Sequence, residues 1–134
     1  MSQITNPFIR TNDHSFEKGC YSSAFEICSG HLPEADWMEI QDLAEHADTS
    51  LLLFECFTLP ESDAVGFKLI GTPWIDEHLC NVMGHGLSTL QAKQEEEFPP
   101  EVIRLLTLAA QADVRFLIFD PNGFVLEGLP LFDC

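Results

Sequence analysis

The chain has 134 residues, of which 46% are apolar, so it has room for one hydrophobic core but not for two. Six basic residues face 22 acidic ones, and the formal net charge is −16. This balance disfavours a nucleic acid or an anionic membrane as a direct partner, because contacts with phosphates need Lys and Arg. A basic protein surface is favoured instead.

The cysteines and the start of the chain indicate a compartment. The five cysteines form no C-x-x-C pair, and the opening MSQITNPFIRTNDHSF lacks the apolar segment of a signal peptide. An odd number of cysteines without an export signal predicts a cytoplasmic protein whose thiols are all reduced. No apolar run approaches the length of about 18 residues that a transmembrane helix needs.

The first third of the chain predicts an arm, a strand and a helix. Residues 1–21 show no clear periodicity and are expected to form an N-terminal arm, docked through Phe8 and Phe16. A single domain is expected over residues 22–134. Its first strand alternates from Ser23 to Cys28. A helix then begins at Pro33, a residue suited to the first helical position, and runs to about Ala47.

The remainder predicts three more strands and a second main helix. The apolar run from Leu51 to Phe57 is typical of a buried strand, and the next strand begins at Val65 as its hairpin partner. Residues 71–98 are hard to interpret, with a short helix expected near Trp74–Met83. A second main helix begins at Pro99-Pro100 and reaches Ala112.

The end of the chain predicts a further hairpin. Val114 to Phe119 is another apolar strand, and Asp120-Pro121-Asn122-Gly123 is a strong turn sequence. Phe124 to Leu126 is expected to return as the hairpin partner of that strand.

These elements predict an α+β fold. The order β-α-β-β-α-β, with one added C-terminal strand, matches a ferredoxin-like split βαβ sandwich with two helices on one face of a mainly antiparallel sheet. Apolar residues on the inner side of each element should form the core. They are Phe25, Ile27, Ile40, Leu43, Leu52, Phe54, Leu106, Phe116 and Ile118.

Two sequence motifs carry a family resemblance. HLPEAD at residues 31–36 and FDPNGFVLEGLPLFD at residues 119–133 together resemble a small bacterial domain family of unknown function, found largely on plasmids and integrative elements. The resemblance covers Ser23 to Cys134, although relatives end in an aromatic residue where this chain has Cys134. It implies a mobile-element setting, where small acidic proteins often counter host defence systems. It supplies no catalytic residues.

The first main helix carries an unbalanced row of carboxylates. A step of about 100° per residue places them opposite the apolar side, except for Asp36. The predicted partner-binding residues are Glu34, Glu39, Asp42, Glu45 and Asp48. With Asp36 they lie along roughly 21 Å, or about one carboxylate per 4 Å, which is close to the spacing of about 3.4 Å between phosphates of a DNA strand. No Lys or Arg offsets their repulsion, so the face is either functional or an ordinary solvated surface.

Other groups of reactive residues have weaker patterns. His78, Cys80 and His85 do not have the spacing of a standard zinc site, so no metal and no cofactor are expected. Cys28 or Cys56 with His31 would offer a thiol nucleophile and a base, but both cysteines lie in predicted strands, where Cys is usually a small apolar residue. Asp120 fits its position as the first residue of a turn.

The leading hypothesis is a non-enzymatic binding protein. Its carboxylates would occupy the Arg and Lys sites of a nucleic-acid-binding defence complex, as a DNA mimic of the anti-CRISPR or antirestriction type does. One alternative is an antitoxin-like accessory module. Another is a small hydrolase or thiol enzyme that uses His31 or a cysteine. The oligomeric state and the identity of the partner are left open.

Overall fold

The computed structural model describes residues 6–8, 22–46, 48–49 and 52–133. Most helices and strands lie close to the segments that the sequence predicts. They are β1 (Ala24–Cys28), a short 3₁₀ turn (Ser29–His31), α1 (Glu34–His46), β2 (Phe54–Thr58), β3 (Val65–Leu69), α2 (Asp76–Val82), α3 (Leu87–Glu95), α4 (Pro100–Gln111) and β4 (Phe116–Asp120).

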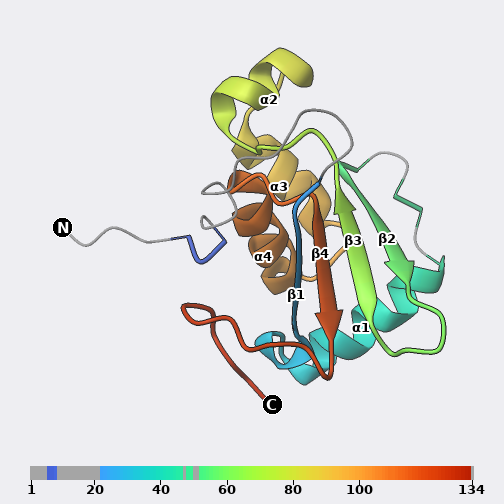
Figure 1. The fold of residues 1–134 in the computed structure, drawn as a ribbon. Helices are drawn as coiled ribbons and strands as arrows, with labels where there is room; N and C mark the ends of the chain where they lie inside the picture. Colours follow the sequence, from blue (N-terminus) through green and yellow to red (C-terminus); the bar gives the residue numbers. More distant parts are fainter. Residues whose placement is uncertain (1–5, 9–21, 47, 50–51, 134) are drawn as a thin grey trace.

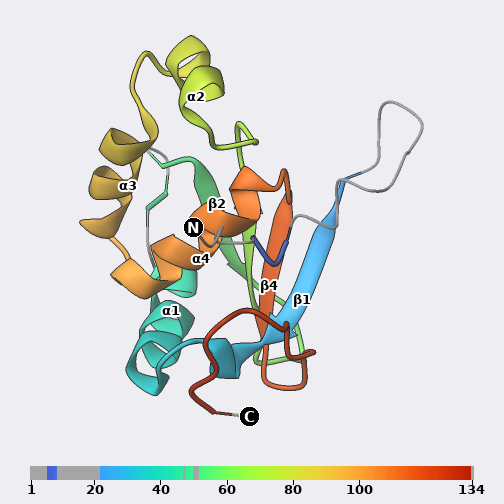
Figure 2. The ribbon, with the colours of Figure 1, turned by 90° about the vertical axis from the view of Figure 1, so that its left-hand side faces the viewer.

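The four strands form one mixed sheet in the order β1-β4-β3-β2. β1 and β4 are parallel, whereas β4 with β3 and β3 with β2 are antiparallel. Figures 1 and 2 show α1, α3 and α4 together on one face of this sheet, with α2 beyond one end of it. Within the described residues, no helix is long and apolar enough to cross a membrane.

The α+β class is confirmed, but the strand order does not confirm a ferredoxin-like topology. The first and last strands are parallel neighbours here, and three helices rather than one connect β3 to β4. The helix expected near Trp74–Met83 is α2. α3 has no counterpart among the predicted elements, because this helix has only Leu90 and Gln94 buried and so lacks an apolar stripe.

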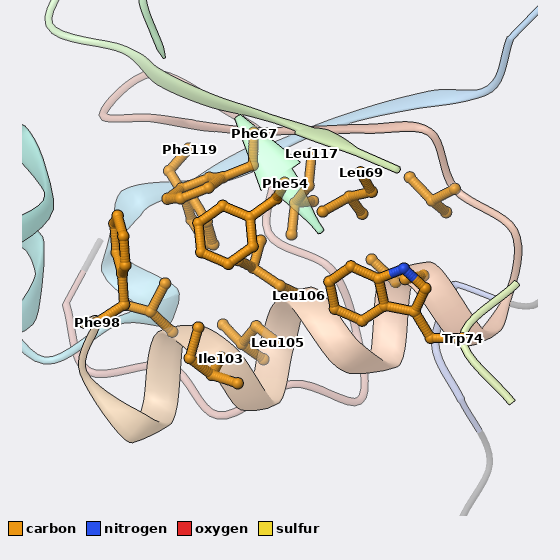
Figure 3. Close-up of a cluster of buried hydrophobic side chains, with 14 of the residues drawn as sticks. Phe54, Phe67, Leu69, Trp74, Phe98, Ile103, Leu105, Leu106, Leu117 and Phe119 are labelled. Atoms are coloured by element: carbon orange, nitrogen blue, oxygen red, sulfur yellow. The ribbon is translucent and has the colours of Figure 1, made fainter. Parts of the chain in front are cut away.

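The core lies between the sheet and α4, as Figure 3 shows. Aromatic rings from β2, β3, β4 and the segment just before α4 meet edge to face, with ring centroids 5.0 to 6.1 Å apart. The rings are those of Phe54, Phe67, Phe98 and Phe119. Trp74 closes one end of this cluster and donates from its indole nitrogen to the carbonyl of Ile70 at 2.8 Å.

Five of the nine expected core residues are buried, and four are half-buried. Ile27, Ile40, Leu52, Phe54 and Leu106 are buried. The half-buried ones are Phe25, Leu43, Phe116 and Ile118. In β4 the expected face is wrong, because Leu117 and Phe119 point into the core instead. A continuous apolar run has no alternation from which the inner face of a strand can be chosen.

The predicted C-terminal hairpin is wrong. The turn forms, with the Asp120 side chain accepting from the Asn122 amide at 2.9 Å and the Asp120 carbonyl accepting from Gly123 at 2.8 Å. However, β4 already has β1 on one side and β3 on the other, so it offers no free edge. Phe124 instead forms an isolated parallel bridge with Ile27 on the outer edge of β1. We call residues 121–133 the C-terminal hook.

The N-terminal segment packs against the same edge of the molecule. Phe8 is fully buried, and its ring lies 5.0 Å from that of Phe25 in β1. The Asn6 side chain donates to the carbonyl of Leu108 in α4 at 2.5 Å. Docking through Phe8 is therefore confirmed, whereas Phe16 lies outside the described residues.

Candidate functional site

All five predicted partner-binding carboxylates are exposed. Glu34, Glu39, Asp42 and Glu45 lie on the outer side of α1, while Asp48 lies two residues beyond the end of this helix. We call these five residues the acidic face. The opposite side of α1 buries Ile40. The helix contains no Lys or Arg, so its carboxylates have no strong cation on their own element.

His46 is the one basic residue of α1, and it lies in the last turn of this helix. Its Nδ1 lies 3.5 Å from a carboxylate oxygen of Asp42, and both side chains are at least 70% exposed. Pairs this exposed contribute little to stability and are easily exchanged for another partner. On α1 itself this imidazole is the one basic group beside Glu34, Glu39, Asp42 and Glu45, and these four carboxylates are exposed.

Met38 lies in the middle of the acidic face, and the sequence analysis missed it. Its side chain is 63% exposed. It follows Glu34 by four residues and precedes Asp42 by four, so it is next to both on the helix surface. The same step of about 100° that placed the carboxylates would have revealed it. A flexible apolar side chain among charges is a suitable anchor for a partner surface.

Asp36 lies on the inner side of α1, as predicted, and is half-buried. Burial raises the pKa of this carboxyl, and repulsion from Glu101 at the start of α4 raises it further. Glu101 itself is held by Arg104, with the closest nitrogen and oxygen 2.6 Å apart. Negative charge therefore extends from Asp36 on α1 to Glu101 on α4. Of these two carboxylates, Glu101 is the one that pairs with an arginine in the described structure.

The Asp36→Asn variant should be slightly more stable than the parent at pH 7, by about 0.5 kcal/mol, since a disfavoured charge is removed. A raised pKa means that the folded state binds the proton more tightly than the unfolded state, so acidification stabilises the parent. The difference should therefore shrink as the pH falls from 7 towards 4. Urea unfolding of both proteins across this range measures it, and a constant difference would contradict the assignment.

His31, the base candidate of the enzyme hypothesis, has both ring nitrogens engaged. It is fully buried, its Nδ1 lies 2.7 Å from the carbonyl oxygen of Pro130, and its Nε2 accepts from the amide of Leu126 at 2.9 Å. A carbonyl only accepts and an amide only donates, so the ring carries its proton on Nδ1. In this geometry His31 holds the C-terminal hook and has no free nitrogen for a thiol.

The cysteines differ sharply in state. Cys28 is disulfide-bonded, so the expectation of five reduced thiols is wrong, and its partner lies outside the described residues. Sequence spacing does not reveal which sulfur atoms a fold brings within bonding distance. Disulfides persist mainly in oxidising compartments, so the disulfide at Cys28 does not support a cytoplasmic location, which stays a prediction. Cys56 and Cys80 are free thiols, and burial raises the pKa of Cys56 to about 12.

Iodoacetamide at pH 7.5 under non-reducing conditions should modify Cys80 and leave Cys56 unmodified. Cys80 is exposed, whereas Cys56 is half-buried and keeps its proton, and only the thiolate reacts. Peptide mapping by mass spectrometry measures both sites. In a Cys80→Ser control, Cys56 should stay unmodified until urea is added. Equal labelling of the two cysteines in the folded parent would refute the prediction.

The weak metal candidate does not form a cluster. His78 and Cys80 lie two residues apart in α2, so they point to different sides of the helix, and His85 lies in the following loop. Among the described residues, no three His, Cys, Asp or Glu side chains are arranged to hold a metal ion.

A hollow of about 320 Å³ joins the acidic face to the C-terminal hook. Glu34 and Trp37 of α1 line one side of it, and Pro121 and Asp133 of the hook line the other. Figures 1 and 2 show α1 and the hook at the same end of the molecule. The start of α1 and the hook therefore form one continuous surface.

The fold and this surface define a small, acidic α+β domain. The chain belongs to the family described as "Family of unknown function (DUF5983) C-terminal domain", which matches residues 24–134. The match begins at the first residue of β1 and includes the acidic face, His31 and the hook. This range agrees with the expected resemblance to an uncharacterised domain family. No curated protein and no solved structure matches the chain.

Proposed function

We propose that this protein is a non-enzymatic binding protein that presents the acidic face to a basic surface of another protein. The observation that carries the proposal is the exposure of four carboxylates along a helix without Lys or Arg, with a fifth exposed carboxylate, Asp48, just beyond its end. Such an arrangement costs about 0.2–0.5 kcal/mol for each like-charged pair at helical spacing. A partner that supplies Lys and Arg would relieve this cost on binding.

The positions of the few cations support the same proposal. Four of the six basic residues lie in the described part of the chain, and none of these is on α1. Two of them, Arg104 and Arg115, already pair with Glu101 and Asp113. In the described structure, the carboxylates of Glu34, Glu39, Asp42 and Glu45 are exposed on α1, where a cation of a partner could reach them. Met38 adds an apolar contact at the centre of the acidic face, which a protein surface can use.

We further propose that the partner is the nucleic-acid-binding surface of a bacterial defence complex, and that the protein comes from a mobile element. The carboxylates would act as a DNA mimic, occupying the Arg and Lys sites that otherwise hold phosphates. The acidic face competes with phosphates for these sites because its carboxylates have a spacing similar to that of the phosphates along a DNA strand. The protein itself needs no contact with nucleic acid in this scheme.

A plasmid transformation assay tests this role. Cells that carry a restriction or CRISPR system should accept a targeted plasmid more readily when they express the parent protein. The isosteric variant Glu39→Gln, Asp42→Asn, Glu45→Gln should lose this protection while it accumulates to the same level. If the parent protects in no defence system while a pull-down identifies a different basic partner, the defence role is wrong and only the binding role stands.

A further inference from the structure

The C-terminal hook holds its backbone firmly while it displays apolar side chains to solvent. Four hydrogen bonds fix its course. His31 donates to the Pro130 carbonyl and accepts from the Leu126 amide, the Cys28 amide donates to the Phe124 carbonyl at 2.8 Å, and the Phe132 amide donates to the Gly30 carbonyl at 2.7 Å. Inside the hook, Leu129 is buried. Gly123 is pressed so close to β1 that a Cβ atom there would lie 2.6 Å from the Ile27 carbonyl.

The outward side chains of the hook are unusually apolar. Four of the eight large apolar side chains that are exposed in the described residues lie in this one segment. They are Phe124, which is 83% exposed, and Val125, Leu131 and Phe132, which are about half-exposed. A flexible tail could expose such residues by chance, but a backbone fixed by hydrogen bonds presents them in one arrangement. Apolar patches of this kind mark interaction sites.

A groove runs between the hook and the outer edge of β1. It has a volume of about 260 Å³, with Glu26 and Ile27 of β1 on one side and Phe124 and Val125 of the hook on the other. β1 is the last strand of the sheet on this side. The bridge of Phe124 with Ile27 occupies the Cys28 end of this edge, and by the alternation of a strand the backbone groups of Ala24 and the amide of Glu26 are directed to the same edge beyond the bridge. Such an edge accepts an extended segment as an added strand.

The charge around the groove determines which kind of partner segment can bind in it. Glu26 and Glu127 are exposed, neither forms an ion pair within the described structure, and residues 116–133 contain no Lys or Arg. A second copy of this chain would bring the same carboxylates together, so self-association through the groove is disfavoured. A segment that alternates apolar residues with Lys or Arg would fill the groove and neutralise its rim.

We propose that the groove between β1 and the C-terminal hook is a second binding site, which takes an extended segment of a partner protein with alternating apolar and basic residues. The segment extends the sheet at Ala24–Glu26 and places its apolar side chains against Phe124 and Val125. The residues that line this groove include none of the acidic face, and the proposal stands even if that face is ordinary surface.

Fluorescence anisotropy with labelled hexapeptides tests the proposal at about 0.15 M ionic strength. The acetylated and amidated peptide Lys-Val-Lys-Val-Lys-Val should bind the parent protein. Its Glu-Val counterpart should not bind, and its Lys-Ser counterpart should bind at least about 10-fold more weakly, because an apolar anchor typically dominates such contacts. Phe124→Ser should weaken binding of the Lys-Val peptide about 10-fold or more, without altering the melting temperature, because this side chain is mostly exposed.

Val82→Ser is the matched control, since it removes a half-exposed apolar side chain from α2, at the end of the molecule away from the hook, and should leave peptide binding unchanged. Equal binding of the Lys-Ser and Lys-Val peptides would show attraction by charge alone and would overturn the proposal. Two further results would overturn it as well. One is a dimer of the parent that Phe124→Ser converts to a monomer. The other is peptide binding that appears only after residues 9–21 are replaced by a Gly-Ser linker.

Discussion

Replacing His31 with alanine is expected to lower the free energy of unfolding by roughly 3 kcal/mol or more. The substitution removes a fully buried ring and both of its hydrogen bonds. It leaves the Leu126 amide and the Pro130 carbonyl without their partner, and each unsatisfied group costs about 1–3 kcal/mol. Urea unfolding followed by circular dichroism measures the loss. Hydrogen exchange should show faster exchange at Leu126 than at residues of β3.

Three variants separate the causes of this loss. His31→Phe keeps most of the volume but neither hydrogen bond, whereas His31→Gln keeps a donor and an acceptor. We expect Gln to recover more stability than Phe, because the ring acts mainly through its two nitrogens. His46→Ala is the control for loss of an imidazole, since His46 is exposed, and it should change stability by less than about 0.5 kcal/mol. A His31→Ala protein as stable as the His46→Ala protein would show that the hook does not depend on His31.

The triple variant Glu39→Lys, Asp42→Lys, Glu45→Lys is expected to abolish binding at the acidic face while the protein stays folded. Each substitution replaces one negative charge with one positive charge, so the three together change the formal net charge from −16 to −10. The new lysines at positions 39 and 45 attract Asp36 and Asp48, which the original carboxylates repelled. The melting temperature should therefore stay the same or rise. Binding of a labelled nona-arginine peptide should fall at least about 10-fold, and binding to the parent should weaken with salt because exposed charges are screened.

A matched variant distinguishes the acidic face from overall charge. Glu95→Lys, Glu96→Lys, Glu97→Lys reverses three exposed carboxylates at the end of α3 and gives the same net charge. It should keep most of the peptide binding and also the protection in the transformation assay. If the two triple variants lose binding equally, net charge alone explains the attraction, and the acidic face is ordinary solvated surface.

The sequence predicted those elements whose own residues determine them. α1 and α4 begin beside prolines and carry regular apolar spacing, so both were placed to within two residues. β3 shows a clear alternation, and its observed bounds, Val65–Leu69, follow it. The five residues of the acidic face were predicted as exposed for the same reason, because helical spacing alone separates the two sides of α1.

The remaining features depend on contacts between distant parts of the chain. His31 bonds to residues 95 and 99 positions away, and no local pattern marks it as the anchor of the hook. The residues after Gly123 have the composition of a hairpin strand, but their pairing depends on whether β4 has a free edge. That is a property of the whole sheet. The inner face of β4 and the disulfide at Cys28 were missed for similar reasons.

The position of β1 in the sheet affects how the protein folds during synthesis. β1 is synthesised before its neighbours in the structure, β4 and the hook, and Ile27 pairs with Phe119, 92 residues further along the chain. At a synthesis rate of about 5–20 residues per second, an apolar strand waits roughly 5–18 seconds for its partner. The growing chain therefore carries an unpaired strand throughout that interval. Chaperones that bind exposed apolar strands have that interval in which to act, and the sheet closes only in a late, long-range step.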